Sequence, residues 1–185
     1  GPVSFAFPSS VSNVLTVPLL ETVRNEFPKI VLRAMDAMSG HVQAWLTEGA
    51  IDFGILYDVN CSRELEMRPL LAEDLYLVSA RDCWKGEIAA NGIAREPVSI
   101  AECHGHGFVL PHRAHGLREV VERFSQTHSA QLDVVVEMDS LSRIKSLVAR
   151  GSGYSILALA AVHEEIERGE LVLIPIREPG LRRTV

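Results

Sequence analysis

The sequence predicts an α/β protein, because extended apolar segments alternate with helical ones along the chain. Val3, Phe5 and Phe7 alternate as they do in a strand, and "KIVLRAM" and "IDFGIL" have the composition of two further strands. Residues 11–26 and 39–49, which lie between these strands, carry apolar residues at helical spacing. The order βαβαβ is typical of a parallel sheet with helices on its faces.

Local signals define the ends of these first helices. Pro18 falls inside the first helical pattern, so we expect its first turns to be a separate or kinked piece. Ser39 is expected to be the N-cap of the second helix, and Gly49 its C-terminal stop.

A second α/β unit follows. Residues 66–80 contain two extended runs, and residues 81–106 hold most of the turn signals, which indicates a lobe boundary near residue 76. The pattern then continues with alternating strands and helices, in the order strand 107–111, helix 115–129, strand 132–138, helix 139–153, strand 154–159, helix 160–170 and strand 171–176.

Composition narrows the function classes. The chain has 185 residues and a net charge of -6, whereas a module that binds duplex DNA is usually basic. A long apolar run and a signal peptide are both absent, so a cytoplasmic protein without membrane contact is expected. The odd number of cysteines, at wide spacing, suits free thiols: Cys61, Cys83 and Cys103.

Hydroxyl side chains follow the first two strands where each helix begins. Ser9 and Ser10 come after the first strand, and Ser39 and Gly40 come after the second. A helix N-terminus has unpaired N–H groups and a partial positive charge, so a serine there can cap the helix or help to hold an anion. Ligands of open α/β sheets bind at the carboxyl ends of strands, which would bring both serine pairs to one crevice.

Several longer segments resemble the effector-binding domain of LysR-type transcriptional regulators. They are "FPKIVLRAMDAMSGHVQAWLTEGAIDFGIL", "PLLAEDLYLVS", "LPHRAHGLREVVE" and "SLVARGSGYSIL". "SGHVQAWL" is particularly similar to the branch with nitrogen- and sulfur-assimilation regulators. The resemblance implies two Rossmann-like lobes of periplasmic-binding-protein type II architecture, joined by two crossover strands. The lobes would be residues 1–75 plus 155–185, and 76–154.

The resemblance also implies a ligand site and a mode of action. A small, anionic effector would lie between the lobes, without a cofactor. DNA would be bound only by the family's N-terminal winged helix-turn-helix, which this stretch lacks. The implied effector-binding residues come from both lobes and the second crossover: Ser9, Ser10, Ser39, Gly40, Pro111, His112, Tyr154 and Ser155.

The resemblance implies a homodimer, and a tetramer in the full-length protein. The first-lobe helix, in residues 12–26, would pair with the second-lobe helix, in residues 116–128, of an antiparallel partner. Val120 and Phe124 belong to the buried stripe of that second helix, so Arg118 and Glu122 are expected to be exposed and to face the partner.

The same residues allow three other functions: a zinc site, a hydrolase and a solute-binding protein. His104, His106, His112 and His115 lie near Cys103, but their spacing is poor for zinc. A hydrolase is disfavoured because no G-x-S-x-G motif is present, so no enzyme activity is expected. The remaining alternative is a solute-binding protein of a transport system with the same architecture.

Overall fold

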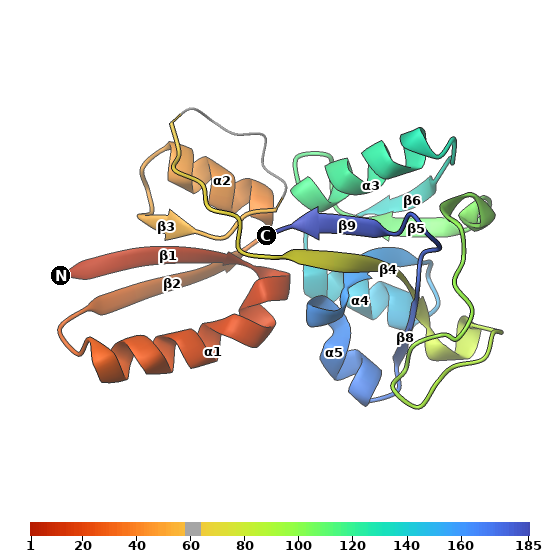
Figure 1. Ribbon diagram of the computed structural model, residues 1–185, viewed down its shortest axis with the longest axis horizontal. Coiled ribbons are helices and arrows are strands. Elements are labelled where there is room, and N and C mark those ends of the chain that lie inside the picture. Colours follow the sequence, from red (N-terminus) through yellow and green to blue (C-terminus); the bar gives the residue numbers. More distant parts are fainter. Residues whose placement is uncertain (58–63) are drawn as a thin grey trace.

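The computed structural model describes residues 1–57 and 64–185, and its strands form three separate sheets. Figure 1 shows two bodies side by side. We call residues 1–57 and 64–71 the first lobe, and residues 72–185 the second lobe. Cys61, expected to be a free thiol, lies outside the described residues.

The first lobe is built on the predicted βαβαβ unit. Its parallel sheet has the order β2-β1-β3, formed by β1 (Pro2–Pro8), β2 (Val31–Ala37) and β3 (Phe53–Gly54). The helices α1 (Ser9–Glu26) and α2 (Ser39–Thr47) begin within two residues of the ends of β1 and β2. Because Pro8 pairs with Ala37, both helices start at the same edge of the sheet.

The expected N-cap role of Ser39 is wrong, and of the two expectations for Pro18 the structure rules out a separate helical piece. The helix α1 runs without interruption through Pro18. Proline leaves the carbonyl of Val14 without its usual amide, but Val14 is on the exposed side of the helix, where water can reach that carbonyl. Ser39 is the first residue of α2 and Met38 is the N-cap, because the Met38 backbone is extended. Its hydroxyl therefore makes no capping bond.

The second lobe surrounds β4 (Ala72–Ala80). Three strands pair antiparallel with it: β7 (Ser155–Ala158), β8 (Leu171–Ile174) and β9 (Leu181–Thr184). A parallel pair, β5 (Gly107–Leu110) and β6 (Asp133–Glu137), lies beside them. The helices are α3 (Gly116–Thr127), α4 (Leu141–Ala149) and α5 (Leu159–Glu167), with short 3-10 helices at Arg81–Cys83 and Ile100–Cys103.

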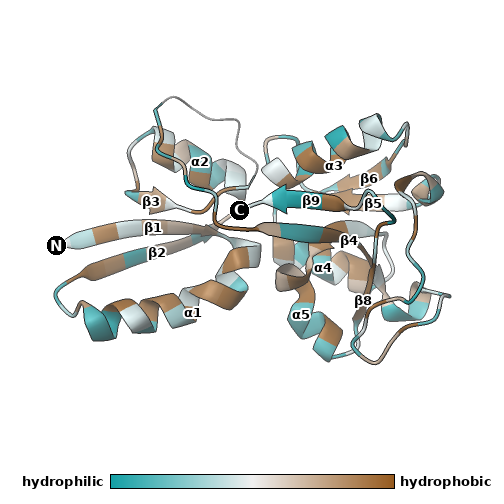
Figure 2. Ribbon diagram, viewed as in Figure 1, coloured by the Kyte–Doolittle hydropathy of each residue, from teal (hydrophilic) through white to brown (hydrophobic). Residues whose placement is uncertain are grey.

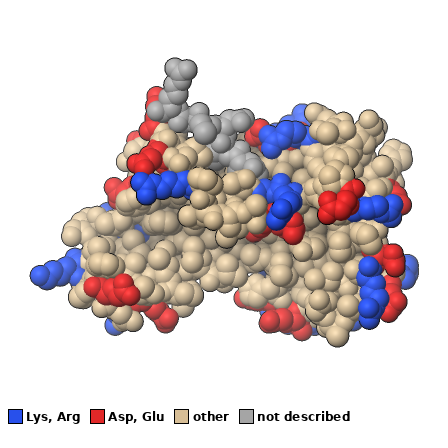
Figure 3. Space-filling view, viewed as in Figure 1, with Lys and Arg blue, Asp and Glu red and all other residues tan. Residues whose placement is uncertain are grey.

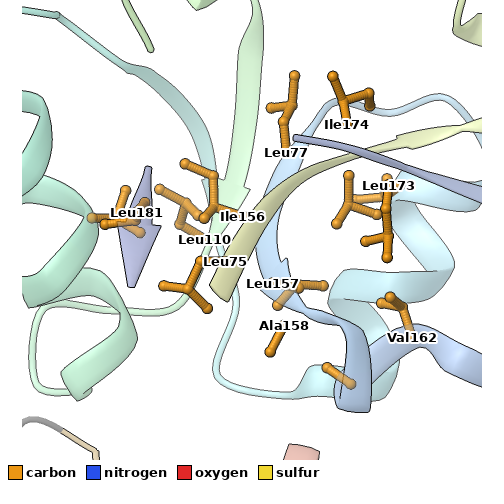
Figure 4. Close-up of a cluster of buried hydrophobic side chains, with 14 of the residues drawn as sticks. Leu75, Leu77, Leu110, Ile156, Leu157, Ala158, Val162, Leu173, Ile174 and Leu181 are labelled. Carbon is orange, nitrogen blue, oxygen red and sulfur yellow. The ribbon is translucent and has the colours of Figure 1, made fainter. Parts of the chain in front are cut away.

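The larger hydrophobic core lies in this second lobe. Figure 4 shows Leu75 and Leu77 of β4 close to Ile156 and Leu157 of β7 and to Leu173 of β8. The strands of this lobe carry hydrophobic residues in Figure 2, whereas the last residues of β9 are hydrophilic. The first lobe has a much smaller buried cluster, of Ala6, Val42 and Ile51.

The predicted division of the chain into lobes needs correction. Residues 155–185 were assigned to the first lobe, but β7 and β8 pair with β4 and are buried in the core of the second lobe. Every residue of these two strands is buried, so they require a sheet that is covered on both faces. The last strand, β9, pairs with the first half of β4 and brings the C-terminus between the lobes (Figure 1).

Over residues 1–57 and 64–185, none of the helices has the length and apolar character that a membrane span requires.

Candidate ligand site between the lobes

A small pocket lies where the N-termini of α1 and α2 meet the second lobe. The space open to the centres of water molecules is about 40 Å³, enough for a few waters or one small charged group. Its polar lining residues are Ser9, Ser10, Ser39, Tyr57, His115 and Arg183. Its apolar lining residues are Pro8, Met38, Leu117, Leu141, Ile144, Leu157 and Ala161. The pocket therefore has side chains from both lobes, and polar groups beside an apolar wall.

Arg183 is the cation of this pocket. It is on β9, only 4% of its surface is exposed, and its guanidinium carbon lies 3.5 Å from the centre of the Tyr57 ring. One terminal nitrogen donates to Ser10 Oγ at 3.3 Å, and Nε pairs with Glu73 Oε1 at 2.5 Å. Ser10 Oγ also shares a hydrogen bond with the hydroxyl of Tyr57. A buried positive charge is thus held by the Ser10 hydroxyl, the face of the Tyr57 ring and the Glu73 carboxylate.

A second group of contacts joins α2 to the start of α3. Ser39 Oγ accepts a hydrogen bond from Gly116 N at 3.2 Å, and Gly40 N donates to His115 Nδ1 at 3.3 Å. A Cβ atom on Gly40 would lie 2.5 Å from the carbonyl oxygen of Ala114. Glycine is therefore needed for this close approach, and these bonds hold the two lobes together at the pocket.

The protonation of the pocket groups follows from these contacts. Nδ1 of His115 accepts a hydrogen bond from the Gly40 amide, so the ring proton of His115 is on Nε2. This Nε2 lies 3.3 Å from Asp139 Oδ1. Burial raises the pKa of Tyr57, although Arg183 and the Ser10 hydrogen bond oppose this shift. Tyr57 is therefore a neutral hydroxyl at physiological pH, able to donate or accept.

Three of the predicted site residues line the pocket. They are Ser9, Ser10 and Ser39. Ser9 Oγ donates a hydrogen bond to Asp36 Oδ1 at 2.5 Å, so its proton is not available to a ligand. Ser39 uses only a lone pair in bonding Gly116, so its proton is available to a ligand. Gly40 adjoins the pocket through its bond to His115.

Two other predicted residues belong to the loop after β5 and do not line the pocket. The carbonyl oxygen of Pro111 accepts a hydrogen bond from Arg118 Nη1 at 3.0 Å. The amide of His112 donates to Asp139 at 2.8 Å. This loop supports His115, three residues after His112, which is the residue that reaches the pocket.

Tyr154 and Ser155 lie elsewhere in the second lobe. The ring of Tyr154 stacks on His106 with centroids 4.7 Å apart, and Ser155 is completely buried on β7. Within the described part of the chain, Ser155 Oγ has no hydrogen-bond partner. They were expected near the second crossover, but Ser155 pairs with Val78, beyond the stretch of β4 that pairs with β9, and neither residue lines the pocket.

Three polar pocket residues were not among the predicted site residues: Tyr57, His115 and Arg183. Tyr57 follows β3 by three residues, so the rule that ligands bind at the carboxyl ends of strands could have indicated it. Arg183 gave no such signal, because "LRRTV" is a short charged segment at the end of the chain. Only the pairing of β9 with β4 buries its side chain.

The histidine and cysteine side chains are the remaining candidates for a reactive or metal-binding site. In residues 1–57 and 64–185, no three His, Cys, Asp or Glu side chains gather as a metal ion would require. Cys83 and Cys103 are free thiols. Burial raises the pKa of Cys103 to about 11, so this thiol stays protonated and unreactive near neutral pH.

Comparison with known proteins agrees with this architecture. The nitrogen assimilation regulatory protein nac of Klebsiella aerogenes is 28% identical over 154 residues, which cover 83% of this chain and 47% of that protein. The chain thus spans about half the length of this relative.

Two solved structures share the fold over the whole chain. The regulatory domain of CcmR from Synechocystis PCC6803, in complex with 2-PG, has a TM-score of 0.81, 19% identity and 85% of its chain covered. The effector-binding domain of QuiR, in complex with shikimate, has a TM-score of 0.81, 14% identity and 86% of its chain covered. All of residues 1–185 match the family described as LysR substrate binding domain, and the chain therefore belongs to that family.

Proposed function

We propose that the chain is the ligand-sensing domain of a bacterial LysR-type transcriptional regulator, and that it binds a small anionic effector in the pocket between the lobes. The main support is the buried Arg183, which faces the hydroxyl of Ser10 inside a pocket formed by both lobes. Such a group attracts a negative charge, and the partial positive charge at the N-termini of α1 and α2 adds to this attraction. The domain acts as a sensor and not as an enzyme.

The apolar wall defines the other half of the ligand. Leu141, Ile144 and Leu157 line the pocket together with the serines and Arg183. A ligand with an anionic group and a small apolar part would match the chemistry of both surfaces. CcmR and QuiR, in complex with 2-PG and shikimate, support a small organic anion as the effector class.

Ligand binding is tested first by thermal unfolding with a panel of small organic and inorganic anions. A ligand that binds only the folded state raises the melting temperature by mass action. Calorimetry on Ser10→Ala and Ser39→Ala then measures how much each hydroxyl contributes to ligand affinity. A hydrogen bond to a charged group contributes about 1.5 to 3 kcal/mol, so each variant should bind roughly tenfold to a hundredfold more weakly.

Ser142→Ala is the matched control, because Ser142 is an exposed serine in the first turn of α4, outside the pocket. Its affinity should equal that of the parent. If Ser10→Ala and Ser39→Ala lower stability but leave affinity unchanged, the two serines have a structural role only. If no anion stabilises the parent, a regulator without an effector is favoured.

The intact regulator is proposed to be cytoplasmic, to bind DNA through its own N-terminal domain and to form dimers and tetramers. The dimer would use α1, whose 18 residues bury only Ser10 and expose Val14 and Val17. The α3 surface differs from the expectation. Arg118 is buried and bonded to Glu122 and Glu137, so it is unavailable to a partner.

The dimer is tested by light scattering at high micromolar concentration. We expect twice the chain mass for the parent and a monomer for Val17→Asp, because a carboxylate on an apolar interface would lose its water. Leu70→Asp is the control, since Leu70 is equally exposed but lies before β4. A monomeric parent would contradict the proposal.

A further inference from the structure

The guanidinium of Arg183 connects the pocket with the strands β4 and β9. Arg183 on β9 is directly opposite Glu73 on β4, and this end of the strand pair lies at the junction of the lobes. Their side chains are 3% and 17% exposed, and their charged atoms lie 2.5 Å apart. The same guanidinium donates to Ser10 Oγ in the pocket.

The neighbouring pair on the same strands has a different environment. Asp74 is opposite Arg182, and their charged atoms lie 2.8 Å apart. These side chains are 57% and 64% exposed, because successive residues of a strand point to opposite faces. The two ion pairs thus share strands and chemistry, but only the Glu73–Arg183 pair is largely buried, and its Arg183 lines the pocket.

Glu73 is the carboxylate that pairs with Arg183, and its negative charge opposes an incoming anion. An anion bound at Ser10 would lie beside a guanidinium that Glu73 already neutralises. Where both charges are withdrawn from water, carboxylate and ligand anion repel each other strongly. The cost of anion binding therefore depends on Glu73.

We propose that Glu73 is a built-in competitor for the effector anion. Without effector, Glu73 holds Arg183 at the junction of β4 and β9. An anion in the pocket shares the Arg183 guanidinium with Glu73 or displaces Glu73 from it. Occupancy of the pocket therefore changes the side-chain contact between β4 and β9. This regulation rests on the proposed function, because it requires an anion at the same site.

The proposal is tested by titrating acetate, as a small carboxylate probe, into isotope-labelled domain while amide NMR shifts are recorded. Glu73→Gln keeps an oxygen that can accept from Arg183 Nε but removes the competing charge, so acetate should bind about tenfold more tightly or better. Arg183→Gln should abolish binding. Asp74→Asn is the matched control and should bind within about twofold of the parent.

The double variant shows whether Glu73 acts through Arg183. If it does, Glu73→Gln gains no affinity when Arg183 is already glutamine, and the double variant resembles Arg183→Gln. The inference is also supported if the amides of β4 and β9 shift on acetate binding to the parent and not to Arg183→Gln.

Two results would overturn the inference, and they differ in whether the proposed anion site remains valid. If the parent binds acetate but Glu73→Gln gains no more than Asp74→Asn, the competitor role is wrong while the anion site stands. If neither the parent nor Glu73→Gln binds acetate, removal of the competing charge has revealed no site, and the proposed function fails as well. A thermal melt of each variant confirms that the fold is retained.

Discussion

Asp139, two residues after β6, contacts the loop that brings His115 to the pocket. Its Oδ1 accepts the amide of His112 at 2.8 Å and lies 3.3 Å from Nε2 of His115. His115 in turn accepts the amide of Gly40 across the lobe junction. One carboxylate thus fixes the orientation of the imidazole that joins the two lobes.

This arrangement makes the stability of the domain dependent on pH. Burial alone would raise the pKa of Asp139, but the amide of His112 and the neighbouring His115 lower it below the usual value of 3.8. A carboxylate with a lowered pKa contributes stability above its unfolded pKa, and this contribution is lost as the pH falls through the folded pKa.

We therefore predict that Asp139→Asn lowers the free energy of unfolding at pH 6 to 7, and that its difference from the parent shrinks as the pH falls below about 4. Denaturant unfolding curves at several pH values measure both effects. Asp133→Asn, at an exposed position on β6, should show neither. A difference that is constant from pH 3 to pH 7 would contradict the role given to the Asp139 charge.

At the scale of elements, an ion pair joins α4 to α5. Lys145 Nζ lies 2.8 Å from Glu165 Oε1, and the two side chains are 13% and 11% exposed. Glu165 also contacts Arg168 at 3.3 Å. Both helices contribute to the pocket wall, through Ile144 on α4 and Ala161 on α5.

We predict that Lys145→Ala lowers the free energy of unfolding by about 1 to 3 kcal/mol, because it leaves the Glu165 carboxylate largely buried with weaker compensation. Arg123→Ala is the control, since Arg123 and Glu119 form an exposed pair 3.9 Å apart on α3. The control should change stability by less than about 0.5 kcal/mol. Equal losses in both variants would show that burial does not decide the strength of these pairs.

At the scale of the whole molecule, the charge is negative and spread over both lobes. The net charge is -6, and in Figure 3 Lys and Arg side chains are interspersed with Asp and Glu on the face shown. A continuous basic surface is the usual requirement for binding the DNA backbone.

We predict that this domain by itself binds duplex DNA more weakly than about 100 μM at physiological salt. Fluorescence anisotropy with a labelled duplex tests this at two salt concentrations. Tight binding that weakens steeply with added salt would contradict it and would indicate a basic surface that the net charge conceals.

Much of the fold could be predicted because its signals are local. Alternation of apolar residues identified β1, and helical spacing identified α1 and α2. The rule on strand ends placed Ser9, Ser10 and Ser39 in one crevice, and the pocket contains all three. These features depend on neighbours along the chain and on the regular geometry of parallel sheets, which sequence patterns express directly.

The tertiary structure alone decided the charged centre of the site and the division into lobes. Arg183 meets Glu73 across 110 positions of sequence and Ser10 across 173. Both contacts depend on the pairing of β9 with β4. Because β7 and β8 also pair with β4, they belong to the second lobe. Burial of a charged residue in a short strand depends on its partners across the sheet, and no pattern within "LRRTV" specifies those partners.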